Sequence, residues 1–223
     1  MGKVIDHNSY FYRQRWNSHG PGVKWNGAFY YSKEIVKNII PQVKTDRAWL
    51  TVNTYNPDEI PDGCIVFIHN NKNPQNYNWL SGKKGLVLVC GIRGTMEKVA
   101  HLGSPIYLPL SVDISYVEKF KREKDREAAF VGRHSKQTIY LPGGIDYIQD
   151  MPRKQLLAEM ARYKKVYAVG RCAIEAKILG CDVLPYDNRF PDPSIWKILD
   201  NSEAAKILQE RLDEIDGKDN SAK

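Results

Sequence analysis

The sequence has few cysteines, and none of them is placed as a disulfide framework or a zinc site requires. Its four cysteines are Cys64, Cys90, Cys172 and Cys181, and no two of them form a C-x-x-C pair. Most lie in or beside apolar runs, where cysteine packs as a small hydrophobic residue. We therefore expect a reduced protein whose cysteines form neither a disulfide framework nor a zinc site.

Long apolar runs are also missing. No run approaches the roughly 20 residues that a membrane-spanning helix needs. The first residues, Met-Gly-Lys-Val-Ile-Asp-His, do not include the apolar core of a signal peptide. These absences predict a soluble, cytoplasmic protein with no membrane span. The hydrophobic fraction of 42% is still sufficient for a core, and the length of 223 residues fits one large domain or two small ones.

Charge is unbalanced, but no basic run of the nucleic-acid-binding type stands out. The formal net charge is +7, which favours an anionic partner such as a nucleotide, a phosphorylated substrate or a nucleic acid. Ordinary solvated lysines explain this charge equally well. The charged run 119–127 mixes both signs, which predicts an exposed helical connector.

Short apolar runs alternate with helical patterns along the chain. Runs rich in Val, Ile and Leu are typical of parallel strands buried on both faces, and their alternation with helices indicates βαβ units in an α/β fold. The expected strands are 3–7, 48–53, 64–69, 85–91, 105–110, 128–132, 138–141, 166–169 and 182–185. The expected helices are 28–40, 95–102, 151–162, 172–179, 195–199 and 202–215.

The mixed-charge run marks a boundary, because the alternation restarts after it. We predict two small Rossmann-like α/β domains, over residues 1–116 and 117–223, facing each other across a cleft. In open parallel sheets, ligands bind outside the carboxyl ends of the strands. Residues that act on a ligand are therefore expected just after each strand.

The segment 166–187 carries the clearest chemical signal, VYAVGRCAIEAKILGCDVLPYD. Gly170 and Arg171 lie where a strand turns into a helix, and the first N–H groups of a helix bind phosphate well. Arg171 can add a charge-assisted contact. Glu175 lies about one turn further along and can reach a diol beside the phosphates, such as a ribose. The alternative is an ordinary strand-to-helix turn with a salt bridge.

This segment resembles the nucleotide-binding segment of GT-B glycosyltransferases, especially the group 1 (GT4-like) class. There, a Gly-x-x-x-x-Glu-Ala-x-x-x-Gly-x-Pro-Val pattern in the C-terminal domain holds the nucleotide sugar. The matching residues here are Gly170, Glu175, Ala176, Gly180 and Val183. The resemblance implies that Glu175 contacts the ribose of the donor. It also implies a diphosphate-binding turn made of Gly170, Arg171, Cys172 and Ala173.

Three other segments are similar to the same class, in the same order. IYLPLSVD (106–113) is similar to the segment before the interdomain connector, and GLVLVCGIRGTMEKVAHLG (85–103) to a strand and helix of the N-terminal domain. AAFVGR (128–133) is similar to the strand that opens the C-terminal domain. There an arginine and a lysine bind the diphosphate, which implies this role for Arg133 and for Lys136, the nearest lysine. Retaining members often have a further glutamate where this sequence has Tyr167.

The N-terminal half is expected to supply the acceptor site and a general base. CIVFIHNN places His69 at the end of an apolar strand, where a histidine can take a proton from an acceptor hydroxyl. A hydrogen-bonded histidine at a strand end is the alternative. The loop 13–27 offers a second catalytic candidate, His19, and can bind a phosphate or stack an acceptor, or else only pack. Its acceptor-side candidates are Gly20, Gly22, Lys24 and Trp25.

These patterns together predict a compact glycosyltransferase. It would move a sugar from a nucleotide-diphosphate sugar, bound by the C-terminal half, to a hydroxyl held by the N-terminal half. The sequence does not identify the acceptor, and a modified DNA base is one candidate because of the net charge. The sequence has no D-x-D motif, so we expect no essential metal and no cofactor besides the donor substrate. The alternatives are a nucleotide-sugar epimerase and a non-catalytic nucleotide- or nucleic-acid-binding protein of the same fold.

Overall fold

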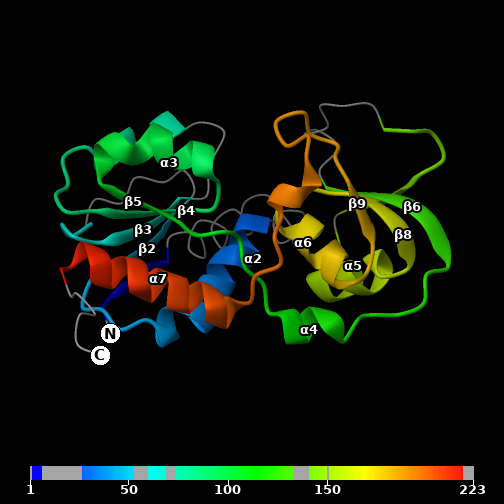
Figure 1. Cartoon of the computed structure of the whole chain (residues 1–223), viewed down its shortest axis with the longest axis horizontal. Coiled ribbons are helices and arrows are strands. Elements are labelled where there is room, and N and C mark those ends of the chain that lie inside the picture. The colour runs from blue at the N-terminus through cyan, green and yellow to red at the C-terminus, as the bar shows by residue number, and fades with distance from the viewer. Residues whose placement is uncertain are drawn as a thin grey trace, which may run out of the picture. The chain divides into compact units, whose positions relative to one another are not determined.

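In the computed structural model, the chain forms two all-parallel β-sheets interleaved with helices (Figure 1). The structure describes residues 2–6, 27–52, 60–68, 74–132, 141–149 and 151–217. It divides into two compact units, Met1–Pro109 with Asn201–Lys223, and Leu110–Asp200. The expected α/β class with parallel sheets is confirmed.

The sheet of the first unit has five strands among the described residues, and its spatial order is the order of the sequence. The strands are β1 (Val4–Asp6), β2 (Trp49–Val52), β3 (Ile65–Ile68), β4 (Val87–Cys90) and β5 (Ser104–Tyr107). Every residue of β3 and β4 is buried. This burial explains why both strands appear in the sequence as continuous apolar runs.

The three helices expected in the first unit form close to their predicted ranges, and a 3₁₀ segment over Pro74–Leu80 forms where no helix was predicted. The expected helix 28–40 is α2 (Gly27–Glu34), which continues as a π-helix (Ile35–Ile39) and a 3₁₀ turn (Ile40–Gln42) that contains Pro41. The other helical elements are a 3₁₀ segment (Pro74–Leu80), α3 (Arg93–Val99), a 3₁₀ turn (Ala100–Leu102) and α7 (Asn201–Ile215).

The last helix, α7, belongs to the first unit, whereas the sequence grouped residues 117–223 together. Its buried face includes Leu208 and Leu212, as the helical spacing predicts. The backbone N–H of Lys44 donates to the side chain of Gln209 at 2.6 Å. Arg47 forms an ion pair with Asp216 at 2.6 Å. These contacts join α7 and the residue that follows it to segments that are distant in sequence, which no local pattern indicates.

The sheet of the second unit has four parallel strands among the described residues, in the order β7-β6-β8-β9. Its strands are β6 (Arg126–Val131), β7 (Asp146–Ile148), β8 (Tyr163–Tyr167) and β9 (Asp182–Leu184). Its helical elements are α4 (Ile114–Glu118), α5 (Arg153–Met160), α6 (Arg171–Ile178) and a 3₁₀ turn (Pro193–Ile195). The expected strand 138–141 lies mostly outside the described residues.

The expected helical connector over 119–127 is wrong. The helix lies earlier, as α4, where Asp113 accepts a hydrogen bond from the backbone N–H of Tyr116 at its start. Residues 121–125 are irregular, and Arg126 already begins β6. Lys124 fixes this path, because its Nζ donates to the backbone carbonyls of Ala161 at 2.8 Å and of Leu179 at 2.7 Å.

The expected helix 195–199 is also wrong. Only the 3₁₀ turn Pro193–Ile195 forms, and its cap is Asp192, whose side chain accepts from the N–H of Ser194 at 2.8 Å. Nζ of Lys177, on α6, donates to the carbonyls of Pro193 and Trp196, each at 2.7 Å. These side-chain contacts hold the segment against α6 in place of helical hydrogen bonds.

Among all described helices, none combines the length and apolarity that crossing a membrane takes.

Candidate functional site

The turn between β8 and α6 lies at the carboxyl edge of the second sheet, as the sequence predicts. Gly170 has a φ of +64°, a left-handed conformation that glycine adopts without strain. Its carbonyl accepts from the N–H groups of Ala173 at 3.1 Å and Ile174 at 3.2 Å. The helix therefore begins at Arg171, and its positive N-terminal end faces the edge where ligands bind in such sheets.

Glu175 is almost completely buried on α6, with 4% of its surface exposed. Its Oε1 forms ion pairs with Nη2 of Arg153 at 2.7 Å and with Nε of Arg171 at 3.3 Å. Both arginine side chains are also largely buried. We call these three residues the Arg–Glu–Arg cluster. Because they are shielded from water, their mutual attraction is stronger than that of surface charges.

Arg153, the first residue of α5, was not among the predicted site residues. Its guanidinium carbon lies 5.6 Å from the centre of the Tyr116 ring, which belongs to α4. Arg153 thus connects α4 and α6 from a third helix. The only sequence signal for it is a basic residue at the start of a predicted helix, and this does not identify a partner so far along the chain.

Cys172, the residue after Arg171, is disfavoured as a nucleophile at neutral pH. Burial raises the pKa of its thiol to about 12, and the nearby negative charge of Glu175 adds to the effect. The thiolate is the reactive form of cysteine, and at such a pKa very little of it is present. We therefore expect Cys172 to contribute to binding through its backbone N–H and not through its thiol.

Tyr186 lies on the same edge, just after β9. Its ring is buried and packs edge-on against Phe130, with the ring centres 4.7 Å apart. A Cβ on Gly132, at the end of β6, would lie 2.8 Å from the Tyr186 hydroxyl, so only glycine fits there without a shift. Burial raises the pKa of Tyr186 well above its ordinary range. The end of β6 is thus packed closely against this tyrosine.

Asp187 and Arg189 form a second ion pair after β9. Asp187 is buried, and its Oδ1 accepts from the backbone N–H of Arg189 at 3.1 Å and from Nε of Arg189 at 2.9 Å. The Arg189 side chain keeps 43% of its surface exposed. The carboxylate therefore orients an arginine that is accessible at the carboxyl edge.

Of the predicted site, the structure brings the turn Gly170–Ala173 and Glu175 together around the start of α6. The other predicted residues lie outside the described residues, and their roles stay predictions. For the diphosphate these are Arg133 and Lys136, and for catalysis His69 and His19. On the acceptor side they are Gly20, Gly22, Lys24 and Trp25.

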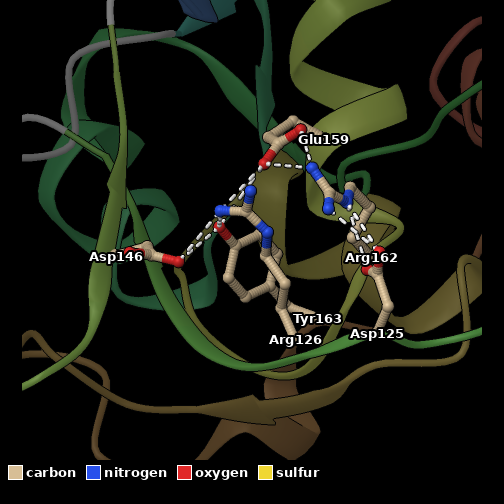
Figure 2. Close-up of polar contacts among 6 residues, drawn as sticks. All are labelled: Asp125, Arg126, Asp146, Glu159, Arg162 and Tyr163. Atoms are coloured by element: carbon tan, nitrogen blue, oxygen red, sulfur yellow. Dashed lines mark hydrogen bonds and ion pairs between the residues drawn. The ribbon is translucent and has the colours of Figure 1, made fainter.

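A second group of charges lies at the amino edge of the same sheet, where β6, β7 and β8 begin. We call it the amino-edge network; its members are Asp125, Arg126, Asp146, Glu159, Arg162 and Tyr163 (Figure 2). The Tyr163 hydroxyl donates to Asp146 at 2.8 Å, and Arg126 donates to that hydroxyl at 2.9 Å. Nη2 of Arg162 contacts Asp125 at 2.9 Å. Because ligands bind at the opposite edge of such sheets, we interpret this network as structural.

The pKa values in the amino-edge network follow from these contacts. The hydrogen bond from Arg162 lowers the pKa of Asp125, and the one from Tyr163 lowers that of Asp146. Burial, together with the hydrogen bond to Asp146, raises the pKa of Tyr163 to about 12. Both carboxylates are therefore charged, and the tyrosine is protonated, throughout the neutral range.

Neither a scan against protein-family models nor a search of the curated proteins gives a match to this chain. The two parallel sheets are consistent with a two-domain Rossmann-like fold. The resemblance to GT-B glycosyltransferases therefore rests on the sequence segments themselves.

Proposed function

We propose that the chain is a GT-B-like glycosyltransferase that moves a sugar from a nucleotide-diphosphate sugar to a hydroxyl acceptor. The observation that carries the proposal is the strand-to-helix turn at Gly170, which sets Arg171 and Glu175 around one helix start at the carboxyl edge of a parallel sheet. This combination of a positive helix end, an arginine and a carboxylate suits a diphosphate joined to a ribose.

Each group of the turn has a role in this proposal. The N–H groups at the start of α6 and the guanidinium of Arg171 bind the diphosphate, and they stabilise its charge as it leaves the sugar. Both ion pairs of Glu175 use Oε1, so the proposal assigns Oε2 to the ribose hydroxyls. Arg133, which follows β6 in the chain, adds a second cation to the diphosphate.

The acceptor half of the proposal rests on sequence. His69, which follows β3, acts as the general base that takes the proton of the acceptor hydroxyl. Replacing His69 by alanine then lowers the turnover rate by about 10² to 10⁴ without a matching loss of donor affinity. A modified DNA base remains one candidate acceptor, because the net charge of +7 favours a polyanion.

A second candidate is a non-catalytic nucleotide-binding protein of the same fold. The observation that favours it is the burial of Glu175, whose carboxylate already contacts two arginines. This is also the arrangement of a purely structural salt bridge at a helix start. Tyr167 stands where retaining enzymes often have a further glutamate, and this difference also favours the second candidate.

The test is a thermal-shift screen of the full chain with UDP, GDP, ADP and their sugars, followed by product analysis. A ligand at about 100 times its Kd stabilises the native state by about 2.7 kcal/mol, which such a screen detects easily. Stabilisation by a nucleotide sugar and transfer to a hydroxyl acceptor support the proposal. Sugar conversion without any acceptor identifies an epimerase instead. Binding without turnover favours the second candidate, and the absence of binding to all these ligands overturns both.

A further inference from the structure

Arg153 contacts Glu175 but begins a different helix from the predicted nucleotide-binding turn. Its Nη2 lies 2.7 Å from Oε1 of Glu175, closer than Nε of Arg171 at 3.3 Å. Its side chain is 14% exposed. The shorter of the two ion pairs of Glu175 therefore comes from α5 rather than from the turn itself.

This geometry restricts the orientation of the Glu175 carboxylate. Arg171 is four residues before Glu175 on the same helix, so this pair alone can form in several side-chain conformations. Arg153 approaches from another helix, and the Tyr116 ring of α4 lies 5.6 Å from its guanidinium carbon. A guanidinium held in this way from a second helix restricts the orientations that the carboxylate can adopt.

We infer that Arg153 is a positioning residue of the nucleotide site, which acts by holding Oε1 of Glu175 so that Oε2 is presented to the ribose of a nucleotide. This inference rests on the proposed function. Arg153 touches Glu175 rather than the ligand, so its effect reaches the ligand only through the ribose contact. A nucleoside and its diphosphate share that contact, and they differ in the contact to Arg171.

The inference predicts a pattern that a merely structural role does not give. Arg153→Met should weaken binding of uridine and UDP, or of guanosine and GDP, by the same factor of about tenfold or more, the effect of losing a hydrogen bond to a charged group. General damage to the start of α6 would weaken the diphosphate more than the nucleoside, because the phosphate contacts lie there. Arg153→Lys should recover part of the affinity, since it keeps the charge but not the planar fork.

Arg162 offers a matched control. It follows the end of α5, as Arg153 begins it, and it also pairs with carboxylates, those of Asp125 and Glu159. Its partners lie at the amino edge, away from the turn. Arg162→Met should therefore leave the affinity for uridine and UDP unchanged, whatever it does to stability.

The experiment is calorimetric titration of the wild type, Arg153→Met, Arg153→Lys, Arg162→Met, Glu175→Gln and the Arg153→Met/Glu175→Gln double variant. Uridine, UDP, guanosine and GDP are the probes. If Arg153 acts through Glu175, the double variant binds as weakly as Glu175→Gln and no weaker. This comparison holds even if Arg153→Met alone fails to fold, because the double variant removes both charges together.

Two results overturn the inference and are distinct from failure of the proposed function. One is an Arg153→Met variant that binds the probes as the wild type does. The other is a double variant in which the two losses multiply, which shows that Arg153 acts independently of Glu175. A wild type that binds none of UDP, GDP and ADP overturns the inference and the proposed function together.

Discussion

The carboxyl and amino edges of the second sheet both join arginines to carboxylates, but they differ in burial. In the Arg–Glu–Arg cluster, the side chain of Glu175 is 5% exposed, whereas that of Asp125 in the amino-edge network is 49% exposed. Exposed ion pairs contribute little, because water and salt screen them. Buried pairs are costly to break, because the remaining charge loses its partner in a low dielectric. The same residue types therefore contribute differently to the stability of the fold at the two edges.

Glu175→Ala is the strongest test of the difference between the two edges, because we expect it to cause the largest loss of stability. The substitution removes the carboxylate that Arg153 and Arg171 share, and breaking a buried pair in this way costs about 3–5 kcal/mol. Urea unfolding of the variant and the wild type measures the loss. Glu127→Ala is the control, because Glu127 pairs with Lys164 and Lys165 at the surface and its loss should not change stability measurably. Equal stability of the two variants would contradict the importance of burial.

Substitution of Glu175 also tests whether this residue binds the ribose of a nucleotide. If Glu175 binds the ribose, a folded Glu175→Ala or Glu175→Gln protein should bind nucleotides about 1.5–3 kcal/mol more weakly, the range for a hydrogen bond to a charged group. Titration with UDP and GDP provides the measurement. Wild-type affinity in a folded variant would show that the carboxyl edge, like the amino edge, serves only stability.

Arg171→Met separates the two parts of the ligand. The guanidinium at the start of α6 is predicted to bind the diphosphate. Its loss should therefore weaken the binding of UDP or GDP about tenfold to a hundredfold. The matching nucleosides carry no phosphate and should bind nearly as before. The ratio of the two affinities, from one titration series, gives the result. A variant that loses both ligands equally would remove Arg171 from the diphosphate site, and Arg133→Ala would then be the next variant to test.

The two edges also show which features a sequence can predict. Buried parallel strands such as β3 and β4 are continuous apolar runs, and the turn at Gly170 with its following helix is a local pattern. Both were predicted because burial and helix starts depend on neighbouring residues. The pairing of Arg153 with Glu175 was not, because it depends on how two helices pack in the folded protein.

The two wrong predictions have the same origin. A helix over 195–199 has suitable local composition, but Lys177 of α6 binds the carbonyls of Pro193 and Trp196 and holds this segment against α6. The run 119–127 has the charge pattern of an exposed helix, but Lys124 binds the carbonyls of Ala161 and Leu179 instead. In both cases a lysine contact between distant segments competes with the helix: Lys177 reaches the first segment from α6, and Lys124, within the second run, reaches carbonyls elsewhere in the unit.

Alkaline pH should weaken the protein through thiols whose pKa is raised, namely the buried Cys64 and Cys90 and the partly buried Cys172 at the carboxyl edge. Burial raises the pKa of Cys172 and Cys90 to about 12 and that of Cys64 to about 11, from an ordinary value of 9.0. A folded pKa above the unfolded one gives stability that is complete below pH 9 and is lost as pH rises toward 11–12. Thermal unfolding from pH 7 to 10.5 should show the decline begin near pH 9. Native thiols that react with iodoacetamide at pH 7.5 as fast as unfolded ones would contradict it.

The amino-edge network should give the smallest effect. Arg162 contacts two carboxylates, but Asp125 is half exposed, so Arg162→Met should lower stability only slightly, and less still in 1 M salt, where screening acts over about 3 Å. The lowered pKa values of Asp125 and Asp146 mean that the stability from their pairs is present above pH 3.8 and is lost as pH falls further. Urea unfolding of both proteins at low and high salt, at pH 7 and pH 3, isolates this contribution. If Arg162→Met destabilises the protein as much as Glu175→Ala, burial does not separate the two edges, and the network at the start of β6 and β8 is as important to the fold as the buried cluster.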